Sequence, residues 1–153
     1  MNYSFKRQIN DPKQKEAVRF CAKYEMDQGF EIIDVSENPD WYDRGVDLIV
    51  KYPNFDMWID VKCDERIAET GNIAFELIEI ASYEGYLKRG YAYSKVHYIY
   101  YFDWHNKKFY KFRTSNLLKI AFSKSRKSFA TYHPEERYFT LGILIPLQEL
   151  CQN

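Results

Sequence analysis

The chain has 153 residues, of which 46% are hydrophobic and 18% are aromatic, a composition typical of one folded globular domain spanning 1–153. This hydrophobic and aromatic content excludes a disordered chain. The three cysteines have neither the number nor the spacing of a disulfide framework or a zinc finger, and no apolar run is long enough to cross a bilayer. We therefore expect a cytoplasmic protein without a membrane partner.

The formal net charge of zero conceals two halves of opposite sign. Residues 25–84 contain sixteen acidic and four basic residues, a balance of −12, whereas residues 85–127 contain eleven basic residues and one acid, a balance of +10. An acidic half suits cation binding, and a basic half suits a polyanion. The alternative is that the two halves neutralise each other across the folded surface.

The predicted elements begin with a helix that starts at Asp11 and Pro12 and stops at Gly29. Period-two and β-rich runs then predict strands at 31–35, 45–52, 55–62, 73–81, 96–102, 108–113 and 138–145. A short helix is predicted near 84–89, a second helix from 114 or 115 to about 124, and loops at 36–44 and 63–72. This order predicts an α/β (α+β) fold with a central mixed sheet flanked by helices.

Two acids and a lysine occupy strands that otherwise have the composition of buried strands. Alternate residues of a strand project to one face, so Asp60 and Lys62 should lie side by side, and a hairpin would bring Asp47 toward Asp60. Mg²⁺ prefers oxygen ligands, which makes Asp47, Asp60 and the carbonyl of Val61 the predicted metal ligands. Lys62 would serve the attacking water or the phosphate. The alternative is a salt-bridged surface hairpin that contributes little.

Residues 45–50 (Gly-Val-Asp-Leu-Ile-Val) and 59–62 (Ile-Asp-Val-Lys) together resemble the signature of the PD-(D/E)XK nuclease superfamily. That signature is an Asp on one strand and Asp/Glu-x-Lys on the next. Asp47, Asp60 and Lys62 match it, and Val46 stands at the position of the superfamily's Pro. The preceding helix, the three strands, and residues 70–76 and 90–102 extend the similarity to small phage and bacterial members over roughly 11–125.

The resemblance implies a restriction-endonuclease-like core and a metal-dependent endonuclease. Such an enzyme hydrolyses DNA phosphodiester bonds with a water activated by Mg²⁺ or Mn²⁺, and members of this class include homodimers. The alternative is a non-catalytic module on the same fold that binds nucleic acid or a host protein.

Glu76 is the next candidate for the catalytic site. It shares a strand face with Ala74 and Ile78, where an acid needs a partner such as the metal or a water. The alternative is that Phe75 and Leu77 point inward and Glu76 is merely solvated.

Glu16 lies on the first predicted helix. The resemblance implies that a helix-borne acid can complete the metal site, and Glu16 is the best match by position. The alternative is an exposed helix acid close to the basic residues Lys13, Lys15 and Arg19.

The basic half is the predicted DNA-binding surface, because its cations can neutralise phosphates and its interleaved aromatic rings can stack on bases. The residues predicted to contact nucleic acid are Asn72, Lys88, Arg89, Lys107, Lys108, Lys124, Arg126 and Lys127. The alternative is a solvated basic face over an aromatic core.

Overall fold

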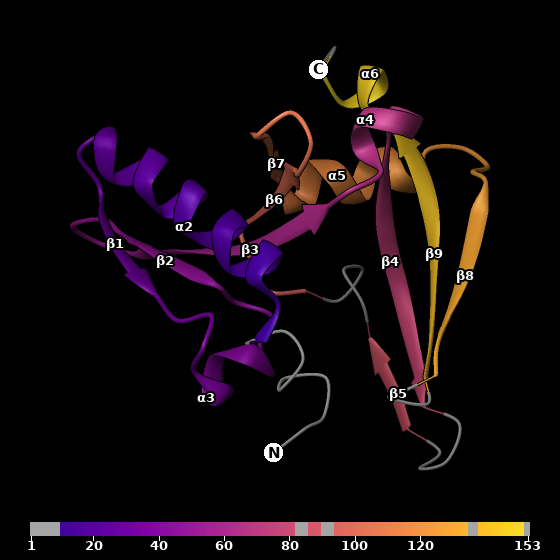
Figure 1. Ribbon diagram of the computed structural model, residues 1–153, viewed down its shortest axis with the longest axis horizontal. Coiled ribbons are helices and arrows are strands. Elements are labelled where there is room, and N and C mark those ends of the chain that lie inside the picture. The colour runs from indigo at the N-terminus through magenta and orange to yellow at the C-terminus, as the bar shows by residue number, and fades with distance from the viewer. Residues whose placement is uncertain (1–9, 82–85, 90–93, 135–137, 152–153) are drawn as a thin grey trace.

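The computed structural model describes residues 10–81, 86–89, 94–134 and 138–151, which form two β-sheets with helices packed around them (Figure 1). Helix α2 (Pro12–Asp27) is the predicted first helix, and the Lys13 amide N–H donates to the Asp11 carboxylate at 2.9 Å to cap it. The shorter helices are α3 (Pro39–Tyr42), α4 (Ile67–Thr70), α5 (Thr114–Ala121) and α6 (Leu147–Leu150).

The first sheet is mixed and holds the candidate site. Its strands lie in the order β1 (Glu31–Asp34), β2 (Leu48–Lys51), β3 (Asp56–Asp64), β6 (Tyr98–Asp103) and β7 (Lys108–Arg113). Strands β3 and β6 are parallel, whereas the other neighbours are antiparallel. This arrangement confirms the predicted mixed sheet flanked by helices, and both predicted hairpins, β2–β3 and β6–β7, are present.

The second sheet is antiparallel and stands beside the first (Figure 1). Its strands lie in the order β5 (Tyr86–Arg89), β4 (Asn72–Ala81), β9 (Tyr138–Pro146) and β8 (Ser128–His133). Residues 86–89 were predicted to be helical and are a strand paired with β4, so that prediction is wrong; its first two residues, 84 and 85, lie outside the described residues. The predicted loop 63–72 contains the end of β3 and helix α4.

The two faces of the first sheet are buried by different partners. Helix α2 covers one face and packs on an apolar cluster that includes Leu48, Ile59 and Val61. The opposite face meets β4, β9 and α5 in a second cluster, which includes Ile49, Ile99, Tyr101, Ile73, Phe75, Ile145 and Leu117. Side chains alternate along each strand, so Asp60 and Lys62 project away from α2 and toward this second face.

Within the described residues, no helix is long and apolar enough to cross a membrane.

Candidate functional site

The β2–β3 hairpin brings Asp47 and Asp60 together. Leu48 pairs with Ile59 in the antiparallel register, and the next residues outward on the two strands are Asp47 and Asp60. The Asp47 amide donates to the Ile59 carbonyl at 2.9 Å, and the Val61 amide donates to Asp47 Oδ2 at 2.8 Å. These two bonds hold the Asp47 backbone and carboxyl group in place opposite Asp60.

Both carboxyl groups are almost fully removed from solvent, because Asp47 and Asp60 are each 4% exposed. They also lie within hydrogen-bonding reach of each other. Burial raises the pKa of Asp47 well above its ordinary value, and the charge of Asp60 raises it further, against the opposing effects of Lys62 and the Val61 amide. Two like charges facing each other across a hairpin destabilise the sheet unless a cation or a proton joins them.

Lys62 supplies one positive charge to this pair. Its Nζ lies 3.2 Å from Asp60 Oδ1, as predicted from their alternate positions on β3. Burial alone would lower the pKa of Lys62, but Asp60, Glu76 and Asp47 together raise it above its ordinary value. Three carboxyl groups therefore act on this ammonium.

Glu76 reaches the same site from the second sheet. It is half-buried on β4, next to an irregularity in the pairing with β9 between Glu76 and Ile78. Phe75 is fully buried in the core, as the alternative for this strand required. Glu76 is nevertheless close enough to Lys62 to raise the pKa of its ammonium, so it is not merely solvated.

Tyr101 belongs to the site and was not singled out in the sequence. It pairs with Lys62 in the parallel β3–β6 register and is 1% exposed. Its hydroxyl donates to the Ala74 carbonyl at 3.1 Å, which links the two sheets. Burial raises the pKa of Tyr101 well above its ordinary value, and the charges of Glu76 and Asp60 add to this effect. Its strand β6 reads as a β-rich run of aromatic residues, and nothing in that run indicates an acidic neighbour.

Gln14, not Glu16, forms hydrogen bonds from α2 to the strand that carries Asp60 and Lys62. The Gln14 side-chain amide donates to the Val61 carbonyl at 2.7 Å and accepts from the Cys63 amide at 3.2 Å. The Val61 oxygen, a predicted metal ligand, thus already has a partner. Glu16 is exposed and its carboxylate lies 2.9 Å from Lys107 Nζ, on a helix that covers the other face of the sheet. The structure does not bring Glu16 to the two aspartates.

The donors at this site are two aspartates rather than a larger acidic cluster. Across the described ranges, no group of three or more His, Cys, Asp or Glu side chains is placed to hold a metal ion. Mg²⁺ is commonly bound by one or two carboxylates, several waters and a substrate phosphate. The buried oxygens of Asp47 and Asp60, which face each other, fit that mode of binding.

Three of the cations predicted to contact DNA are instead paired with acids. Lys107 pairs with Glu16, while Lys124 Nζ and Arg126 Nη1 lie 3.0 Å and 2.7 Å from the Glu149 carboxylate. The Arg126 side chain is 4% exposed and also donates to a backbone carbonyl of α5 at 2.8 Å, so it holds the chain after that helix in place. Part of the basic half is therefore neutralised by acids.

Two other residues predicted to contact DNA lie at the surface. Lys108 and Lys127 are exposed, and the Lys108 ammonium lies 5.3 Å from the centroid of the Tyr110 ring. The Asn72 amide donates to the carbonyl two residues before it, at 2.9 Å. Lys88 and Arg89 lie in the edge strand β5, and their side chains are outside what the structure describes.

Comparisons with protein-family models, with curated proteins and with solved structures found no match.

Proposed function

We propose that this chain is a metal-dependent nuclease of the PD-(D/E)XK type that hydrolyses DNA phosphodiester bonds. One observation carries the proposal: two almost fully buried carboxyl groups face each other across the β2–β3 hairpin, with Lys62 beside Asp60 at 3.2 Å. A hairpin that served only as structure would gain nothing from opposed acids. The order of one helix, three strands and a mixed sheet supports a restriction-endonuclease-like core.

Asp47 and Asp60 would hold Mg²⁺ or Mn²⁺. When bound, the ion polarises the phosphate and lowers the pKa of a water. The Asp47 carboxyl is held by the Val61 amide, and Gln14 holds the backbone of the strand that carries Asp60 from the other side. Such positioning reduces the reorganisation that binding requires.

Lys62 would place its ammonium where negative charge develops on the phosphate, a contribution worth roughly 100-fold or more in rate for one electrostatic group. Glu76 would orient that ammonium from the second sheet, because its charge acts directly on Lys62. DNA would approach over exposed cations such as Lys108 and Lys127, and its affinity should fall steeply with salt concentration.

The test is cleavage of plasmid, single-stranded and branched DNA with Mg²⁺ or Mn²⁺. We expect cleavage that stops on chelation, is lost in Asp60→Asn and falls roughly 100-fold or more in Lys62→Ala. The matched controls are Asp56→Asn and Lys51→Ala, which change an exposed acid–lysine pair on the same hairpin and should leave cleavage unchanged.

Cleavage that survives Asp60→Asn and Lys62→Ala would show that these residues do not form the catalytic site. Salt-sensitive DNA binding without cleavage under any metal would instead assign the chain to the non-catalytic DNA-binding alternative.

A further inference from the structure

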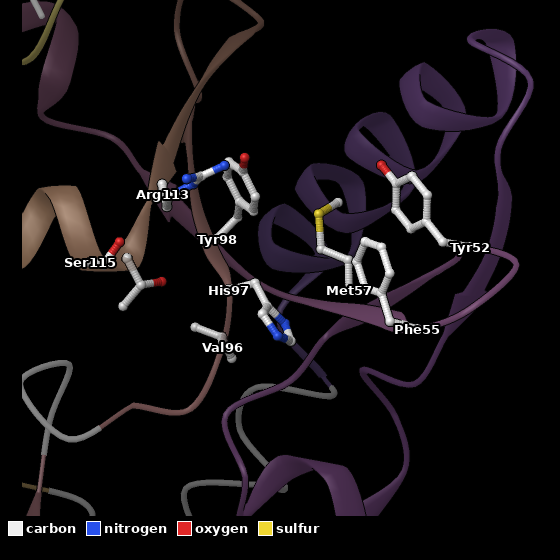
Figure 2. A pocket seen from close by; sticks show the side chains of 9 residues that line it. Tyr52, Phe55, Met57, Val96, His97, Tyr98, Arg113 and Ser115 are labelled. Atoms are coloured by element: carbon white, nitrogen blue, oxygen red, sulfur yellow. The ribbon is translucent and has the colours of Figure 1, made fainter.

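A cavity of about 490 Å³ opens at one end of the first sheet, apart from the acid pair (Figure 2). Three segments line it: the β2–β3 turn, the residues just before and at the start of β6, and the junction of β7 with α5. Its size falls within the roughly 300–1,000 Å³ typical of small-molecule sites. Its lining residues are Tyr52, Phe55, Met57, Val96, His97, Tyr98, Arg113, Thr114 and Ser115.

Aromatic rings form one part of the lining. Tyr52 and Phe55 are stacked, with ring centroids 4.6 Å apart and planes 4° apart, and Phe55 is 57% exposed. Figure 2 shows Tyr52, Phe55 and Met57 on one side and Tyr98 with Arg113 on the other. An exposed, preformed aromatic stack offers its face to a planar ring such as a nucleobase.

The N-terminus of α5 forms another part of the lining. No side chain caps this eight-residue helix, and its first amide, that of Thr114, donates to the His97 carbonyl at 3.0 Å. The next amides have no partner within the helix. They carry the positive end of the helix dipole, which favours a bound anion such as a phosphate. Ser115 adds a hydroxyl group at the same place.

A buried hydroxyl group in this lining lacks a partner. Thr114 is 4% exposed, and its Oγ1 has no hydrogen-bond partner in the part of the chain that the structure describes. Buried hydroxyl groups are nearly always bonded, so an unbonded one in this lining is a candidate donor to a bound anion. Arg113 adds a positive charge beside it, with its guanidinium 5.9 Å from the Tyr98 ring centroid, and none of the nine lining residues is acidic.

We propose that this cavity binds a nucleoside 5′-monophosphate unit. The base stacks on Phe55, and the phosphate sits at the N-terminus of α5 with Arg113, Thr114 and Ser115. The unit is either a free mononucleotide or an unpaired nucleotide of a strand. The cavity shares no lining residue with the Asp47–Asp60 pair, so this proposal and the nuclease proposal are tested separately.

The experiment is calorimetric titration of the full chain carrying Asp60→Asn, in chelator, so that cleavage plays no part. The probes are thymidine 5′-monophosphate, thymidine, inorganic phosphate and a short oligothymidylate. We expect the monophosphate to bind at least tenfold more tightly than thymidine. Binding of the monophosphate identifies a free-nucleotide site, whereas binding of the oligonucleotide alone identifies a site for a nucleotide within a strand.

Substitutions of lining residues test whether the monophosphate binds in this cavity. Phe55→Ala should weaken it about fivefold or more, the contribution of one base stacked on an aromatic ring. Its matched control is Tyr132→Ala, which removes an exposed ring whose centroid lies 4.6 Å from that of Phe139, at a tilt of 36°, on the second sheet. Arg113→Gln should weaken phosphate-dependent binding, whereas Arg44→Gln, which changes an exposed arginine over Trp41, should not.

Thr114→Val tests the buried hydroxyl group in two ways. It should raise the melting temperature of the free chain, because a buried unpaired hydroxyl is removed, and it should weaken binding of the monophosphate. The proposal is overturned if no probe binds at millimolar concentration. It is also overturned if thymidine binds as tightly as its monophosphate, or if neither Arg113→Gln nor Thr114→Val reduces the preference for the phosphate.

Discussion

Two sites in this protein bury carboxyl groups on opposite faces of the same sheet, and they are built differently. Glu25, at the α2 face, is 2% exposed, accepts a hydrogen bond from the Tyr100 hydroxyl at 2.7 Å and lies 2.5 Å from Lys111 Nζ. On the other face, the buried Asp47 and Asp60 face each other, and Lys62 Nζ lies 3.2 Å from Asp60 Oδ1.

The difference lies in the groups that each buried acid faces. At Glu25 one acid meets one lysine and one hydroxyl donor, so the buried charge is compensated within the fold. At the other site Asp47 and Asp60 face each other, Lys62 lies beside Asp60, and the half-buried Glu76 acts on that lysine. A buried acid paired with a base and a hydroxyl donor is a structural element, whereas buried acids opposed to each other mark a candidate functional site.

The largest effect on stability is expected at the compensated site. Glu25→Ala leaves the Tyr100 hydroxyl and the Lys111 ammonium without their partner, so the free energy of unfolding should fall by about 3 kcal/mol. Cleavage per folded molecule should stay unchanged. Urea denaturation measures the loss, and Glu31→Ala, an exposed acid on β1, is the control. A loss of cleavage with unchanged stability would reverse the roles of the two sites.

Adding Mg²⁺ should stabilise the chain through the Asp47–Asp60 site. A ligand that binds only the folded state at 100 times its dissociation constant raises the unfolding free energy by about 2.7 kcal/mol. The gain should be present in Glu25→Ala and absent in Asp60→Asn. Thermal denaturation with and without Mg²⁺ measures it, and an equal gain in Asp60→Asn would show that the ion binds elsewhere.

Asp47→Asn should change how stability depends on pH in chelator. The folded chain holds the Asp47 proton more tightly than the unfolded chain, where the pKa has its ordinary value of 3.8, so stability is lost as pH rises above that value toward the folded pKa. Asn keeps a carbonyl oxygen for the Val61 amide and removes the charge.

The variant should therefore be about 1 kcal/mol or more stable than the wild type at pH 7, with the difference shrinking toward pH 4. Urea denaturation across this range measures it. An unchanged difference between pH 4 and pH 7 would mean that Asp47 keeps an ordinary pKa beside Asp60.

The smallest effect is expected at Glu16. Its ion pair with Lys107 is exposed at both ends, so Glu16→Gln should change the unfolding free energy by less than about 0.5 kcal/mol. Cleavage should remain within twofold of the wild type. A loss of cleavage comparable to that of Asp60→Asn would place Glu16 in the catalytic site despite its position over the other face of the sheet.

Much of the fold could be predicted because its signals are local. The Asp11 cap, the helical spacing that follows it and the two hairpins are set by residues close in the sequence, and the structure confirms them. Strand β2 begins at Leu48, later than predicted, because Gly45 has a left-handed φ of +66° that an extended strand cannot include.

Other elements depend on distant partners. Residues 86–89 form a strand because β4 pairs with them. Strand β8 (Ser128–His133) was not predicted, because its extended conformation depends on pairing with β9. Neither segment has a hydrophobic period that would identify it alone. Their conformations follow from pairing within a sheet whose strands are far apart in the sequence.

By itself, the sequence determined that Asp60 and Lys62 share a face and that Asp47 lies across the hairpin from them, because strand alternation and a short turn are local constraints. Tertiary structure alone decided that this face turns toward the second sheet. Glu76 and Tyr101 join the site for that reason, and Glu16 stays over the opposite face. Which face of the strand turns toward the second sheet depends on the packing of apolar surfaces that are distant in the sequence. No local sequence pattern predicts that packing.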